Sequence, residues 1–121
     1  MPLLNVRSVK GGLSMPKRIV YLLQLYRKQL EKKLGQHLKA VILYGSYARG
    51  DFKNDSDIDI LILVDLTNFQ ECEDKVFDLT YDFNLENDIE IMPIVQNIEH
   101  FNKWKNAYMF YRNISMEGVA I

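Results

Sequence analysis

The sequence predicts an α/β domain in which a small sheet packs against helices in two layers. Three short apolar runs, at 39–44, 57–64 and 89–95, have the length and composition of buried strands. Longer segments at 17–34 and 67–87 carry apolar residues at helical spacing. Strands that alternate with helices in this way are typical of α/β architecture. With 121 residues, the chain is long enough for one compact domain and too short for two ordinary ones.

The composition excludes several classes of protein. Apolar residues make up 48% of the chain and charged residues 26%, as in globular domains. No apolar run approaches the roughly 20 residues that cross a membrane, and the N-terminus lacks the apolar core of a secretory signal. The single cysteine, Cys72, excludes an intramolecular disulfide framework, and its place on an apolar helix face predicts a buried structural thiol. We therefore expect a cytoplasmic protein with no membrane segment.

Charge is divided unevenly along the chain, although the net charge is only −1. Residues 1–53 carry eleven Lys or Arg and two Asp or Glu, whereas residues 54–121 carry four and fourteen. The basic half could attract ATP phosphates, RNA or an acidic partner. Equally, it could be a solvated helix face with a cationic tail.

The N-terminal half begins with residues 1–14, which we expect to form a flexible tail before a single domain at 15–121. Pro16 suits a first helical turn, and Gly35 suits a helix end. The apolar residues between them recur at helical spacing: Ile19, Leu22, Leu23, Tyr26, Leu30 and Leu34.

The first predicted strand, 39–44, is continuously apolar, which indicates cover on both faces. A short helix at 46–49 and a polar loop at 50–56 lead to the second strand at 57–64. Thr67 suits the cap of the next helix, which Asn87 and Asp88 should end. Its expected apolar side consists of Phe69, Cys72, Val76, Thr80 and Phe83.

The third strand, 89–95, contains Pro93, which predicts an edge position or an irregularity because proline lacks an N–H group. Two shorter helices are expected after it, at 97–103 and 107–116, the second ending at Gly118.

Four residues beside the first two strands point to nucleotide chemistry. Gly45 and Ser46 follow the first strand, and Asp57 and Asp59 open the second. Because side chains alternate along a strand, the two carboxylates lie on the same side, about 7 Å apart along the chain. Carboxylates so close repel one another, and a divalent cation such as Mg²⁺ removes that repulsion. The glycine turn offers backbone N–H groups that suit a phosphate.

The spacing G-S-x10-D-x-D resembles the signature of the DNA polymerase β-like nucleotidyltransferase superfamily. The longer stretch GSYARGDFKNDSDIDILI resembles the minimal nucleotidyltransferases, small proteins often encoded beside a HEPN-domain toxin. The resemblance implies a two-layer polymerase β-like fold with a small mixed sheet. It also implies that Gly45 and Ser46 hold the phosphates of ATP, and that the catalytic carboxylates Asp57 and Asp59 bind Mg²⁺.

The superfamily places a third catalytic and metal-binding carboxylate on the following strand. Glu90 stands where the family commonly has an aspartate, with Asp88 as the alternative. A glutamate there departs from the family pattern, and its longer side chain bears on catalytic rate more than on metal binding. Arg49 suits a nucleotide phosphate, or equally a carboxylate in the segment 51–59.

By resemblance, the protein is expected to be a Mg²⁺-dependent protein adenylyltransferase. It would transfer AMP from ATP to a hydroxyl of a partner, such as a tyrosine of a HEPN toxin, and so act as the antitoxin of a type VII toxin–antitoxin system. The alternative is a weakly catalytic or non-catalytic antitoxin that neutralises its partner by occlusion. No direct role in nucleic-acid binding is expected, and association between copies of the chain is left open.

Overall fold

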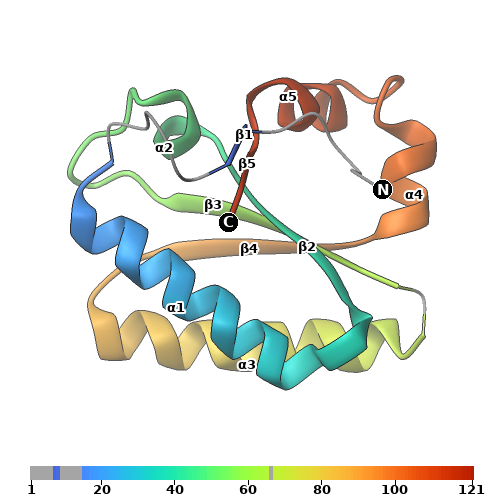
Figure 1. Cartoon of the computed structure of the whole chain (residues 1–121), viewed down its shortest axis with the longest axis horizontal. Helices are drawn as coiled ribbons and strands as arrows, with labels where there is room; N and C mark the ends of the chain where they lie inside the picture. The colour runs from blue at the N-terminus through green and yellow to red at the C-terminus, as the bar shows by residue number, and fades with distance from the viewer. Residues whose placement is uncertain (1–6, 9–14, 66) are drawn as a thin grey trace.

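The computed structural model describes residues 7–8, 15–65 and 67–121 of the chain. The predicted tail, 1–14, lies outside the described residues except for a two-residue strand at Arg7–Ser8. The elements follow in this order (Figure 1): β1 (Arg7–Ser8), α1 (Lys17–Leu34), a 3₁₀ turn (Gly35–His37), β2 (Leu38–Tyr44), α2 (Ser46–Arg49), β3 (Ile58–Val64), α3 (Phe69–Asn87), β4 (Ile91–Asn97), α4 (Ile98–Trp104), α5 (Met109–Glu117) and β5 (Val119–Ala120).

The sheet is mixed, as the resemblance implies. Its strand order is β1-β5-β2-β3-β4, in which β2 runs antiparallel to β3 and to β5, while β3 and β4 are parallel. The edge position predicted for Pro93 is confirmed, because β4 is the last strand of this order. The side chain of Asn84 also bonds both the N–H and the C=O of Ile91. Together these features leave fewer free backbone groups on this edge strand, and so they disfavour pairing with a strand of another molecule.

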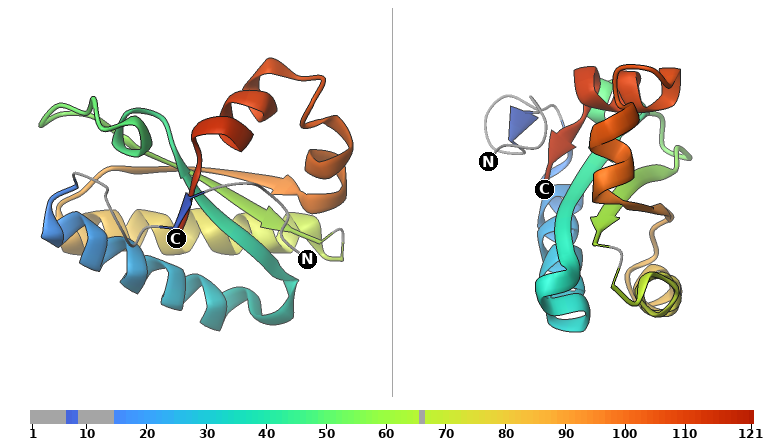
Figure 2. Two further views of the ribbon diagram at one scale, coloured as in Figure 1. Left: turned by 45° about the horizontal axis from the view of Figure 1, so that its top comes forward. Right: turned by 90° about the vertical axis from the view of Figure 1, so that its right-hand side faces the viewer.

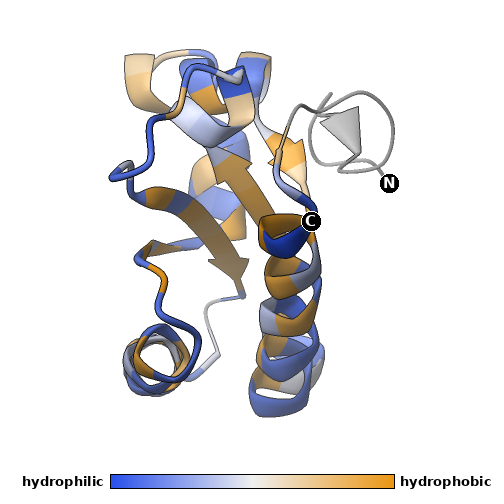
Figure 3. Cartoon of the chain, turned by 90° about the vertical axis from the view of Figure 1, so that its left-hand side faces the viewer, coloured by the Kyte–Doolittle hydropathy of each residue, from blue (hydrophilic) through white to orange (hydrophobic). Residues whose placement is uncertain are grey.

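Helices cover both faces of the sheet (Figure 2), and the described residues form an apolar core on each face. Helices α1 and α3 pack on the face that carries Val41, Leu43 and Ile60. Helices α4 and α5 cover part of the other face, where Phe101 and Tyr111 contact a cluster that includes Ile42 and Leu61. The predicted cover on both faces of the first strand is therefore confirmed, and β2 and β3 are among the most hydrophobic elements (Figure 3).

Several predicted boundaries hold. Helix α1 has the predicted bounds and ends at Gly35, whose φ is +57°. Helix α2 also matches, and Asp88 ends α3 with φ +51°. Cys72 is buried on α3, as expected. In the part of the chain that the structure describes, no helix has both the length and the apolar character needed to cross a membrane.

Other boundaries were predicted wrongly. Thr67 does not cap α3: its N-cap is Asn68, which has φ +55° and makes no side-chain cap hydrogen bond. Strand β4 begins at Ile91 rather than at residue 89 and continues to Asn97, so Glu90 stands just before the strand. Strand β5 was not predicted, because two residues are too short to show a period of 2.

Tyr26 is the most deeply buried hydroxyl-bearing side chain of the α1–α3 interface. Its hydroxyl lies 2.6 Å from Oγ1 of Thr80, which itself donates to the C=O of Val76 at 2.6 Å. The Thr80 proton is therefore committed, so the Tyr26 hydroxyl must be the donor. Burial raises the pKa of Tyr26 to about 12, because a buried phenolate is poorly solvated.

We expect the free energy of unfolding to fall between about pH 10 and pH 12. The unfolded tyrosine ionises near pH 10, whereas folded Tyr26 keeps its proton to about pH 12. Unfolding therefore releases a proton in this window, and stability falls by up to about 1.4 kcal/mol per pH unit.

Tyr26→Phe should make this dependence of stability on pH less steep, as measured by urea unfolding at several pH values. Tyr21→Phe, at a side chain that is 64% exposed, is the control and should leave the slope unchanged. An unchanged slope in Tyr26→Phe would contradict the expectation.

Candidate functional site

The turn between β2 and α2 has room only for glycine. Gly45 has φ +78° and ψ −154°, a conformation that favours glycine. A Cβ added at this position would collide with Oδ2 of Asp59 and lie 3.2 Å from its Cγ. The Asp59 carboxylate therefore rests against the backbone of the turn. The two halves of the G-S-x10-D-x-D motif, well separated in sequence, meet in space at this contact.

Asp59 is held there by the sheet. It pairs with Tyr44 across the β2–β3 ladder and with Met92 across the β3–β4 ladder. Its neighbours Ile58 and Ile60 enter the α1–α3 core, so Asp59 faces the other side of the sheet. Partial burial raises the pKa of Asp59, the charge of Asp57 raises it further, and the Arg49 guanidinium opposes both effects. The predicted repulsion between the two aspartates is therefore present in the fold.

Glu90 lies beside Asp57. Each stands one residue before the first registered pair of β3 and β4, Ile58 and Ile91, and the Ile58 N–H donates to the C=O of Glu90 at 2.8 Å. Asp88 is instead the left-handed residue that ends α3. Four acidic residues line one cavity of about 350 Å³: Asp55, Asp57, Asp88 and Glu90.

The predicted carboxylates do not form a closed metal cage. Among the described residues, no three His, Cys, Asp or Glu side chains converge as a group that could hold a metal ion. Asp59 lies against Gly45, whereas Asp57 and Glu90 line the neighbouring cavity. Mg²⁺, however, commonly binds one or two carboxylates and fills its other positions with water and substrate phosphates. The mutually repelling pair Asp57 and Asp59 therefore fits a Mg²⁺ ion that arrives with a nucleotide.

Arg49, the last residue of α2, is an exposed cation beside the glycine turn. Its Nε lies 3.2 Å from Oδ2 of Asp51, so one of the two predicted alternatives, a carboxylate in the segment 51–59, is observed. Its Nη1 lies 3.2 Å from Oε1 of Glu117, a contact that the sequence analysis missed. Helix α2 has only four residues, so its macrodipole is small. An anion held at this turn would therefore depend on individual N–H groups and on Arg49.

Two further contacts fix the shape of the turn and of the loop that follows it. Ser46 begins α2 and is half-buried, and its C=O accepts from the N–H groups of Gly50 and Asp51. Tyr47 is buried and stacks on Phe52, with ring centroids 4.4 Å apart and planes within 5°. This stacking fixes the short helix against the loop that leads to Asp57.

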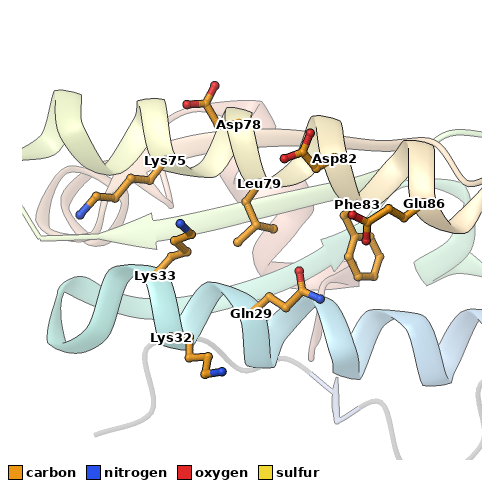
Figure 4. A pocket seen from close by; sticks show the side chains of 9 residues that line it. All are labelled: Gln29, Lys32, Lys33, Lys75, Asp78, Leu79, Asp82, Phe83 and Glu86. Carbon is orange, nitrogen blue, oxygen red and sulfur yellow. The ribbon is translucent and has the colours of Figure 1, made fainter.

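A larger cavity lies elsewhere in the described part of the chain. It has a volume of about 630 Å³ and opens between α1 and α3 (Figure 4). Its lining combines basic, acidic and apolar side chains from the two helices. They include Lys32, Lys33, Lys75, Asp78, Asp82, Glu86, Leu79 and Phe83. None of the predicted site residues lines this cavity, and α1 and α3 cover the face of the sheet opposite to Asp59. Cavity size alone therefore does not locate the candidate site.

Comparison with known proteins gives consistent results. The nucleotidyltransferase domain family matches residues 23–116. Two proteins of Methanocaldococcus jannaschii, each named "Putative protein adenylyltransferase", are similar in sequence. One is 44% identical over 89 residues, which are 74% of this chain and 83% of that protein. The other is 36% identical over 77 residues, which are 64% and 78%.

One solved structure shares the fold. It is described as "Crystal structure of the toxin-antitoxin with AMP-PNP", and it superposes with a TM-score of 0.50 at 16% sequence identity. The match covers 80% of this chain and 70% of that chain. At this identity, the likeness concerns the fold alone.

Proposed function

The chain belongs to the nucleotidyltransferase domain family, and from this premise we propose that it transfers AMP from ATP to a hydroxyl group of a partner protein. The observation that carries the proposal is the contact between Gly45 and the Asp59 carboxylate. This contact brings the phosphate-binding turn and the acidic pair into one place. The two relatives named as protein adenylyltransferases support a protein as the acceptor.

In this proposal, each residue has a definite role. The N–H groups of Gly45 and Ser46 and the Arg49 guanidinium bind the phosphates of ATP. Asp57 and Asp59 would hold Mg²⁺, which would supply neutralisation of the phosphate charge. The acceptor oxygen forms a bond to the α-phosphorus, the bond from that phosphorus to pyrophosphate breaks, and the hydroxyl proton passes to a carboxylate of the chain.

Glu90 is the proposed proton acceptor and third acidic residue. Its place beside Asp57, at the start of the β3–β4 register, supports it over Asp88, which ends a helix. Glu90→Gln is expected to lower turnover by about 10²–10⁴-fold, the usual contribution of a positioned base, while ATP affinity changes less. Asp88→Asn is the matched control and should keep most of the activity. A strong loss of turnover in Asp88→Asn alone would reverse the assignment.

For the partner, we propose a HEPN-domain toxin with a tyrosine as the acceptor, which makes this protein the antitoxin of a type VII system. The shared fold with a chain of a toxin–antitoxin structure is compatible with this role. AMP on a tyrosine adds bulk and a negative charge, which repel RNA phosphates from a ribonuclease cleft. Such silencing persists after the two proteins separate, so one antitoxin can inactivate many toxin molecules.

A second candidate function is neutralisation by occlusion with little catalysis. The observation that favours it is the separation of the carboxylates into two neighbouring groups rather than one closed set within the described residues. Occlusion requires at least one antitoxin per toxin and does not depend on ATP.

The experiment that tests the proposal uses the purified protein, the purified HEPN protein, Mg²⁺ and ATP labelled at the α-phosphate. Transfer predicts label on the partner, release of pyrophosphate, and loss of ribonuclease activity at antitoxin-to-toxin ratios well below one. Silencing that needs a one-to-one ratio and leaves the partner unlabelled would reject transfer and support occlusion.

A further inference from the structure

Glu117, the last residue of α5, places its carboxylate on the turn assigned above to phosphate. One oxygen, Oε1, accepts from the backbone N–H of Gly45 at 3.4 Å and from Nη1 of Arg49 at 3.2 Å. Both donors belong to the group proposed to bind ATP. A carboxylate oxygen and a phosphate oxygen accept the same charge-assisted hydrogen bonds. Glu117 therefore occupies a position that a phosphate oxygen could take.

The sheet explains why Glu117 lies there. Strand β5 runs antiparallel to β2, with Val119 opposite Leu43 and Ala120 opposite Ile42. Counting back along the same register places Glu117 opposite Gly45. The N–H of Ile121 donates to the C=O of Val41 at 3.0 Å and extends this alignment to the chain end. The pairing of β5 with β2 therefore brings the backbone of Glu117 next to Gly45, so that the contact does not depend on the Glu117 side-chain conformation alone.

Because both are negatively charged, the Glu117 carboxylate and an incoming phosphate compete for the same donors. Arg49 already bonds Asp51, so Glu117 gives the guanidinium a second carboxylate. A phosphate that approaches the same donors meets the negative charge of Glu117, whose side chain is only 28% exposed and therefore weakly screened. Two anions cannot both use the Gly45 N–H, and a backbone N–H has a single proton to donate.

We infer that Glu117 is an internal competitor for the phosphate position and that ATP must displace its carboxylate in order to bind. The inference rests on the proposed nucleotide site and identifies a residue that sets its affinity. Glu117 lowers the affinity for ATP and disfavours smaller phosphate ligands, whose fewer contacts cannot offset the displacement.

The test is the affinity for ATP with Mg²⁺, measured by isothermal titration calorimetry on the full chain. Glu117→Gln keeps the size and an acceptor oxygen but removes the charge, and it should tighten ATP binding about tenfold, which is the scale of one charge-assisted hydrogen bond. Glu99→Gln, on the exposed first turn of α4, is the matched control and should leave the affinity unchanged. Thermal unfolding of each variant verifies that it is folded.

A double-mutant cycle locates the effect. In an Arg49→Gln background, the gain in ATP affinity from Glu117→Gln should shrink, because one of the two shared donors is gone.

Weaker or unchanged ATP binding in Glu117→Gln would overturn the inference; weaker binding would show instead that Glu117 positions Arg49. Failure of both the wild type and Glu117→Gln to bind ATP would overturn the inference and the proposed function together. Tightened binding without AMP transfer would support the inference and reject the proposed reaction alone.

Discussion

Replacing Asp57 and Asp59 together by asparagine is expected to lower AMP transfer on the order of a thousandfold, comparable to the loss of a major electrostatic contact in an active site. The two carboxylates are the proposed ligands of Mg²⁺, and neutral amides hold a divalent cation much less tightly. Stability should not suffer, because burial and the charge of Asp57 both raise the pKa of Asp59 in the native fold. Removing the charges relieves both costs.

The measurement is transfer of α-labelled phosphate from ATP to the partner, together with urea unfolding of the same preparation. Asp74→Asn changes an exposed carboxylate on α3 that lies outside the cavity lined by Asp57, and it is the control for a general loss of negative charge. Near-native transfer in the double variant would reject these residues as metal ligands. If the double variant does not fold, the two single variants are measured instead. Asp57→Asn then comes first, because it changes the more exposed of the two side chains.

Much of the fold can be predicted from local signals. Helical periodicity predicts α1 to the residue, and the apolar runs predict β2 and β3 within one residue. Each depends on neighbours a few positions apart in the chain. The Gly45–Asp59 contact can be predicted at the level of a motif, because the spacing between the glycine turn and the acidic pair matches two adjacent strands.

The missed features depend on partners distant in sequence. Val119 and Ala120 have no periodic pattern, and only pairing with β2 makes them a strand. Glu117 reaches Gly45 through that same pairing, across 72 positions of the chain. A lone glutamate at a helix end carries no local signal of such a contact. The polar residues at the start of α3 do suggest a cap, but they cannot distinguish Thr67 from Asn68, since both residue types are favoured there.

Replacing Gly45 by alanine is expected to damage both stability and transfer, and the chain contains a matched control that separates the two causes. Gly35→Ala has the same kind of cost, a non-glycine residue at positive φ, but an added Cβ there meets no atom within 4 Å. It should lower the free energy of unfolding by about 1–3 kcal/mol and leave transfer intact. Gly45→Ala has this backbone cost and also a collision with the Asp59 carboxylate. It should therefore lose more stability than the control and also lose transfer, because the metal ligand must move.

Shortening the residue on the other side of the contact tests whether the collision is the cause. In Gly45→Ala with Asp59→Ala, the obstructing carboxylate is absent, so urea unfolding should show the stability returning to about the level of Gly35→Ala. Transfer should remain absent, since Asp59 is the proposed ligand. If instead Gly45→Ala and Gly35→Ala lose equal stability and both retain transfer, the close approach of Asp59 to the turn is not a feature of the working site. Recovery of stability without recovery of transfer would assign Gly45 its role. That role is to let the Asp59 carboxylate lie directly against the backbone proposed to bind phosphate.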